Sequence, residues 1–198
     1  MAFAAMLLIS PAQAVEWKAT ERIKYYDVSG DTGFALYEAI GAKGPMFGGT
    51  RRAIGLTEYD LKWRRDYQPQ AAPAQAGQNE KTSCTLASAT PLLNITYSLP
   101  RAKPSGALAR RWQAFAAGIE THERVHGAHI RDMVDAIIAD TVGLTVENDA
   151  KCTKIRAEVL TRVKAALAAY IARTRAFEAE EMGNGGNVQR LILGLVDG

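Results

Sequence analysis

The three histidines of this 198-residue chain all lie within a segment of eight residues. His122, Glu123 and His126 form the pattern H-E-x-x-H. On a helix, histidines four positions apart project from one face, where both imidazoles can bind one zinc ion. The glutamate between them then lies beside a zinc-activated water, from which it can take a proton and pass it to a leaving amine. The pattern therefore predicts a helix with a hydrolytic zinc site and Glu123 as its general base.

The sequence around the motif favours a long helix with an inward-facing stripe. Ser105 is a suitable N-cap, and no proline interrupts residues 112–138. Apolar residues recur at steps of three and four: Trp112, Phe115, Ala116, Ile119, Ile130, Met133, Val134 and Ile137. At about 100° per residue the histidines share the side of this stripe. Backbone carbonyls can satisfy one buried histidine, but three in consecutive turns are better explained by a shared ion. We predict that His122, His126 and His129 bind zinc.

Residues 1–14 are typical of a signal peptide. They are mostly apolar and end in Ala12-Gln13-Ala14, the small-x-small pattern that signal peptidase reads. No lysine or arginine precedes Glu16, so we expect this signal peptide to be truncated at its start. The apolar run is too short to span a bilayer, which takes about 20 residues. We therefore expect a periplasmic or secreted protein with no stable membrane span.

The cysteines and the charge are consistent with export. Cys84 and Cys152 are the two cysteines of the chain, and neither belongs to a C-x-x-C pair, so we expect them to form a disulfide. The net charge is only +3, and the basic residues are spread along the chain rather than gathered in a stripe. Nucleic acid is therefore not expected as a partner. The sequence leaves the oligomeric state open.

The chain is predicted to fold as one α+β domain over residues 15–182, followed by a C-terminal tail at 183–198. A small antiparallel or mixed sheet should pack on two long helices, the motif helix and a second one at 149–181. The other expected elements are strands at 21–28, 53–67 (or a hairpin there), 84–89 and 92–99, a short helix at 32–42, and a mobile surface loop at 68–81.

Several short patterns follow one another along the chain: Tyr26-Asp27-Val28-Ser29-Gly30, Gly44-Pro45, the strand at 63–67, Cys84, Leu99-Pro100, Trp112, Phe115, the H-E-x-x-H motif and Cys152. With them, the chain resembles a bacterial family of predicted secreted zinc-dependent proteases that carries a domain of unknown function. The resemblance covers about residues 25–185, and only the motif and Cys152 are specific to it. It implies a zincin-like fold in which His122 and His126 bind zinc and Glu123 is the general base.

The chain departs from this resemblance at the third zinc ligand. The family pattern has a T-x-H-G stretch after the second helix, whose histidine could complete the site, but this chain has glycine there and no histidine after His129. His129 lies about 10 Å from His122 along a straight helix, so joint binding would need a bend or a break near Gly127. The alternatives depend on how the second helix packs: Glu158, Glu178, Glu180 and Glu181. We choose His129 because the spacing alone fixes its face.

These observations lead us to expect an exported zinc metallopeptidase that hydrolyses peptide bonds of a peptide or protein substrate. The alternative is a non-catalytic envelope protein that binds zinc or a partner, in which the altered third ligand marks lost activity. A closed site of four protein ligands would favour the alternative, because a catalytic zinc keeps one position open.

Overall fold

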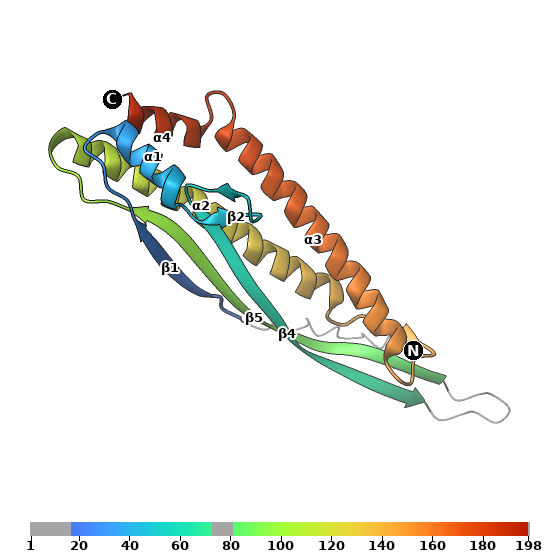
Figure 1. The fold of residues 1–198 in the computed structure, drawn as a ribbon. Helices are drawn as coiled ribbons and strands as arrows, with labels where there is room; N and C mark the ends of the chain where they lie inside the picture. Colours follow the sequence, from blue (N-terminus) through green and yellow to red (C-terminus); the bar gives the residue numbers. More distant parts are fainter. Residues whose placement is uncertain (1–16, 73–80, 198) are drawn as a thin grey trace, which may run out of the picture.

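The computed structural model describes residues 17–72 and 81–197, which form a mixed sheet with helices on one face (Figure 1). The strands are β1 (Thr20–Asp27), β2 (Met46–Phe47), β3 (Arg51–Arg52), β4 (Leu56–Ala72), β5 (Lys81–Arg101) and β6 (Thr145–Glu147). The helices are α1 (Gly33–Lys43), α2 (Gly106–Thr141), α3 (Thr153–Met182) and α4 (Asn187–Val196). The predicted α+β fold, with a mixed sheet and two long helices, is confirmed.

The long strand β5 organises the sheet. It pairs with β1 in parallel on one side and with β4 antiparallel on the other. The short β6 pairs antiparallel with β5 near its start. β2 and β3 form a separate small hairpin ahead of β4.

The main core lies where β5 meets α2. Successive strand residues face opposite sides of a sheet, so Leu93, Ile95, Tyr97 and Leu99 share one side of β5, and all four are buried. The predicted stripe of α2 is buried against them: Trp112, Phe115, Ile119, Ile130, Met133, Val134 and Ile137. This packing determines which side of α2 turns inward, and the three histidines, which lie next to that side and contact Phe177 of α3, are buried as well.

The sequence predicts two strands between residues 84 and 99, whereas the structure has one continuous strand. β5 runs through Pro91, where it has β4 on one side only, because its pairing with β6 ends at Thr85 and its pairing with β1 begins at Asn94. A proline is tolerated in a strand where its missing N–H faces an unpaired edge. Pairing with the antiparallel strand β4 therefore keeps β5 continuous through Pro91.

The expectation of a surface loop at 68–81 is wrong at both ends of this range, where the structure has strand. Residues 68–72 belong to β4, which pairs with β5 up to the register Ala72↔Lys81. Residues 73–80 lie outside the described part of the chain, as does the expected signal peptide at 1–14. The composition of 68–72 is poor in strand-forming residues, so the pairing with β5 overrides the local preference.

The segment 183–198, expected as a tail, contains α4. Its Val188 and Leu195 are buried in the main core, and α4 packs on α1, α2 and α3. Gly33 allows this close approach, because a Cβ there would lie 1.8 Å from the carbonyl oxygen of Leu195. The described part of the domain therefore extends to the end of α4.

A second, smaller core surrounds the disulfide at the other end of the long helices. The predicted Cys84–Cys152 bond is present, with a Cα–Cα distance of 5.3 Å. The neighbouring buried side chains are Leu86, Ala89, Ile155 and Val159. The bond joins the start of β5 to the residue before α3.

None of the helices in the described residues is both long enough and apolar enough to cross a membrane.

Candidate metal centre

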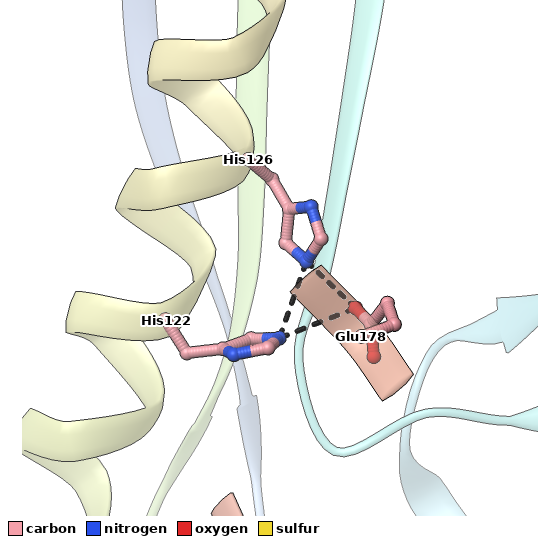
Figure 2. A group of neighbouring side chains, drawn as sticks. All are labelled: His122, His126 and Glu178. Carbon is pink, nitrogen blue, oxygen red and sulfur yellow. Dashed lines mark hydrogen bonds and ion pairs between the residues drawn. The ribbon is translucent and has the colours of Figure 1, made fainter. Parts of the chain in front are cut away.

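α2 presents the two motif histidines side by side. His122 and His126 are one turn apart, and their Nε2 atoms are 3.2 Å from each other (Figure 2). Their rings are nearly perpendicular, with centroids 4.9 Å apart. The helix continues unbroken through the motif, so the i,i+4 spacing sets this arrangement directly. The predicted convergence of these two imidazoles is therefore present.

α3 brings a carboxylate to the same point. Oε1 of Glu178 lies 3.2 Å from Nε2 of His122 and 2.7 Å from Nε2 of His126. Figure 2 shows the two imidazoles extending from α2 towards this carboxylate on α3. The side chain of Glu178 is 45% exposed, whereas both imidazoles are buried. The group therefore lies at the edge of the core, with its carboxylate on the solvent side.

The spacing of these three donor atoms is close to that required by a small metal ion. His122, His126 and Glu178 form a group that could hold such an ion. A tetrahedral zinc ion with bonds of about 2.0–2.1 Å places its ligand atoms about 3.3 Å apart. Two of the three observed separations are 3.2 Å and the third is 2.7 Å. A movement of roughly half an ångström of the half-exposed carboxylate would therefore complete the geometry.

The electrostatics of the group favour an ionised carboxylate. Hydrogen bonds from His122 and His126 outweigh burial and lower the pKa of Glu178 to about 2. Burial disfavours charged His122, but hydrogen bonding to Glu178 and the nearby charge of Glu123 raise the pKa of His122 above its usual value. A metal-binding glutamate must be deprotonated, so Glu178 is in the required form at neutral pH.

Glu123 lies beside this group and is held by the start of β4. It is only 5% exposed, and its Oε2 accepts a hydrogen bond of 2.6 Å from the hydroxyl of Thr57. A Cβ on Gly55 would lie 2.4 Å from the other carboxylate oxygen, so the glycine makes room for it. Tyr26 donates to the carbonyl of Ile54 and secures this segment. Burial raises the pKa of Glu123, and the Thr57 hydrogen bond opposes that rise.

His129 is buried on the same side of α2 but lies outside the group. Its ring centroid is 6.3 Å from that of His126, and its Nδ1 has no hydrogen-bond partner among the described residues. Burial lowers the pKa of His129, and nearby Arg173 adds to this effect. α2 shows no break at Gly127, so nothing shortens the path from His122. Ligation by His129 stays a prediction that would require the helix to rearrange.

Phe177 on α3 fills the space between the three histidines. Its ring stacks on His122 with centroids 4.9 Å apart and an interplanar angle of 21°. It meets His126 and His129 edge-on, at 5.3 and 5.5 Å. The residue that packs on the imidazoles thus directly precedes Glu178 in the chain.

The other candidate glutamates differ in position. Glu158 precedes Glu178 by about 30 Å along α3 and is paired with Arg162 at 3.0 Å. Glu180 is exposed. Glu181 contacts His122, but at Nδ1, the nitrogen that faces away from the group, at 3.3 Å. Among the glutamates that the sequence left open, Glu178 is therefore the one that the structure places with both histidines.

The family model described as bacterial protein of unknown function (DUF922) matches residues 23–186. The chain belongs to this family. The DUF922 match extends from β1 to just before α4, so it includes the three grouped residues and Glu123. The expected membership of a bacterial family with a domain of unknown function is confirmed, and the description of DUF922 states no activity. No curated protein and no solved structure matches the chain.

The sequence alone does not mark Thr57, Gly55 or Phe177 as parts of this site. Thr57 precedes Glu123 by 66 residues, and nothing in its local sequence distinguishes it from other strand residues. Phe177 was identifiable only as one apolar residue of the second helix. The spacing of histidines and apolar residues predicts which face of α2 carries the site. The contacts that other elements make with this face depend on tertiary packing.

Proposed function

We propose that this chain is an exported zinc metallopeptidase with a zincin-like arrangement of its motif helix and sheet. The observation that carries the proposal is the convergence of His122, His126 and Glu178, with Glu123 held next to them. Two histidines and a glutamate form a common ligand set of catalytic zinc sites. The three donors leave room for a fourth position, which a closed structural site would fill with protein.

A bound zinc ion would supply Lewis acidity, which polarises a carbonyl group and makes water acidic enough to lose a proton near neutral pH. Glu123 would accept that proton and deliver it to the leaving amine. The hydrogen bond from Thr57 holds Oε2 of Glu123, and Oε1, which lies against Gly55, would make this transfer. The buried surroundings of Glu123 strengthen its interaction with the developing charge.

β4 could hold an extended substrate. Within the described residues its ladder is with β5 alone, so its other edge is open to a further strand. Peptides commonly bind such an edge by adding a strand to the sheet. Because Thr57 of β4 contacts Glu123, a peptide on this edge would run past the candidate centre.

Export is supported by the disulfide and by the apolar start of the chain. A buried disulfide is typical of oxidising compartments, such as the periplasm or the exterior of the cell. Residues 1–14 carry the pattern of a signal peptide. Both features favour a periplasmic or secreted enzyme.

The test is Glu123→Gln in the zinc-loaded protein, assayed on a pool of quenched fluorescent peptides. We expect one zinc per chain in parent and variant, and a loss of hydrolysis of at least 100-fold in the variant, because the amide cannot accept a proton. Glu120→Gln, which removes a carboxylate one turn earlier on α2, is the matched control and should keep the parent rate. His122→Ala should lose the zinc. Equal rates for parent and Glu123→Gln, or a zinc-loaded parent that cleaves no peptide of the pool, would contradict the proposal.

A further inference from the structure

Glu181 occupies a different position from Glu178, although both belong to the same face of α3. It follows Glu178 by three residues, which is nearly one helical turn. Its Oε2 lies 3.3 Å from Nδ1 of His122, whereas Glu178 meets Nε2 of the same ring. The side chain of Glu181 is 17% exposed, against 45% for Glu178. Each ring nitrogen of His122 therefore lies within hydrogen-bonding distance of a carboxylate from α3.

The carboxylate of Glu181 is itself held by α4. Asn187, the first residue of α4, donates from Nδ2 to Oε2 of Glu181 at 3.3 Å. The turn between the helices is tight, because a Cβ on Gly186 would lie 2.3 Å from the carbonyl oxygen of Glu181. The buried Val188 fixes the start of α4 in the core. A series of contacts thus extends from the core through Asn187 to Glu181 and His122.

A histidine that binds a metal through Nε2 must carry its proton on Nδ1. An acceptor at Nδ1 selects this tautomer, fixes the rotation of the ring and makes the ligating nitrogen more basic. In this structure Oε2 of Glu181 lies within hydrogen-bonding distance of Nδ1 at the edge of the His122 ring, and Phe177 stacks on the face of the ring. The ring is therefore constrained in both its plane and its rotation.

We propose that Glu181 is a positioning residue for the metal ligand His122, and that Asn187 anchors Glu181 in turn. In this arrangement one short stretch of α3 supplies three functions: Phe177 packs on the imidazoles, Glu178 ligates and Glu181 orients. The inference rests on the metal site of the proposed function but not on peptide hydrolysis, so it can be tested without a substrate.

The experiment measures zinc affinity by competition with a chromophoric chelator, in the parent and in Glu181→Ala, Glu181→Gln and Asn187→Ala. Loss of such an acceptor typically weakens metal binding by roughly 10–100-fold, and we expect this for Glu181→Ala. Glu181→Gln should recover part of the loss, because its amide oxygen can still accept from Nδ1. Asn187→Ala should weaken binding less than Glu181→Ala, because Glu181 remains in place. Glu180→Ala and Glu180→Gln, which change the exposed neighbour, should match the parent.

Two further readouts separate positioning from a general loss of structure. The metal-free variants should melt within a few degrees of the parent. The absorption spectrum of the cobalt-loaded protein should keep its tetrahedral bands in Glu181→Gln, because the ligand set is unchanged. A Glu181→Ala protein that binds zinc as tightly as a zinc-binding parent would overturn this inference alone. A Glu181→Gln protein as weak as Glu181→Ala, with altered cobalt bands, would also overturn it and indicate direct ligation. A parent that binds no zinc would overturn both this inference and the proposed function, whereas a zinc-binding but inactive parent would overturn only the latter.

Discussion

Gly127, the residue after His126, shows how one missing side chain fixes the position of the motif helix. An ideal Cβ at Gly127 would lie 2.0 Å from the hydroxyl oxygen of Tyr97 on β5. Tyr97 is fully buried, its hydroxyl donates to Glu21 at 3.1 Å, and the guanidinium of Arg124 lies 4.3 Å from its ring centroid. The ring therefore has little freedom to move, and α2 can approach β5 this closely only with glycine at this position.

We expect Gly127→Ala to lower the free energy of unfolding by about 1–3 kcal/mol, because the added methyl overpacks a rigid contact. The matched control is Gly41→Ala in α1, where a Cβ would meet nothing within 4 Å. That change should be neutral or stabilising by up to about 1 kcal/mol, as alanine is the better helix former. Urea unfolding of the three proteins measures both values. A Gly127→Ala protein as stable as Gly41→Ala would show that Tyr97 can move aside.

At the scale of elements, α3 starts from an unusual cap. Its N-cap residue, Cys152, has a left-handed backbone with φ of 55° and makes no capping hydrogen bond through its side chain. Asp149 supplies the cap instead: its carboxylate accepts from the backbone N–H groups of Thr153 and Ile155, each at 2.8 Å. Burial raises the pKa of Asp149, but the hydrogen bonds from the start of α3 outweigh it and hold the pKa below 3.8.

We expect Asp149→Asn to lower the melting temperature at pH 7 by roughly 2–4 °C, because a charged cap is replaced by a weaker one. The ionised carboxylate stabilises the fold above the unfolded-state pKa near 3.8, and this contribution is lost as the pH falls through the lower pKa of the folded state. The difference between parent and variant should therefore shrink below pH 3.8. Thermal melts between pH 7 and pH 3 test this. The control is Asp60→Asn, at an exposed site on β4. A melting-temperature difference between parent and Asp149→Asn that stays constant with pH would contradict the role of the ionised Asp149 carboxylate as the cap.

At the scale of the whole molecule, the disulfide and the candidate metal centre lie near opposite ends of α3. Cys152 precedes Glu178 by about 40 Å along the helix axis. The bond joins residues 68 positions apart in the sequence, so it restricts the unfolded chain considerably. In the chain-entropy model such a loop is worth about 4 kcal/mol. The two features should therefore be independent, one affecting stability and the other metal binding.

We expect the double variant Cys84→Ala/Cys152→Ala to lose about 4 kcal/mol of unfolding free energy while binding zinc at 25 °C with the affinity of the parent. Denaturant unfolding and the chelator competition measure the two quantities. Both single variants should lose as much stability as the double one, because each already breaks the bond. A fall in zinc affinity in the folded double variant would show that the two ends of α3 are coupled.

Several features of this protein follow from local spacing in the sequence. His122 and His126 had to share a face once residues 106–141 were helical, because four positions make about one turn. The alternation from Leu93 to Leu99 determined the buried side of β5. The spacing of the apolar stripe likewise turned α2 inward. These patterns repeat within a few residues, so the chain shows them without any knowledge of its neighbours.

Which residues from other elements meet α2 depends instead on how the elements pack. Four glutamates and His129 were compatible with the sequence as a third ligand, and it is the offset between α2 and α3 that placed Glu178 at the two imidazoles. The same offset put Glu181 at the far side of His122, and the start of β4 brought Thr57 to Glu123. Such contacts depend on how far one packed element is shifted along another. A shift of one turn is about 5 Å and changes every partner, while the local periodicity of each element stays the same.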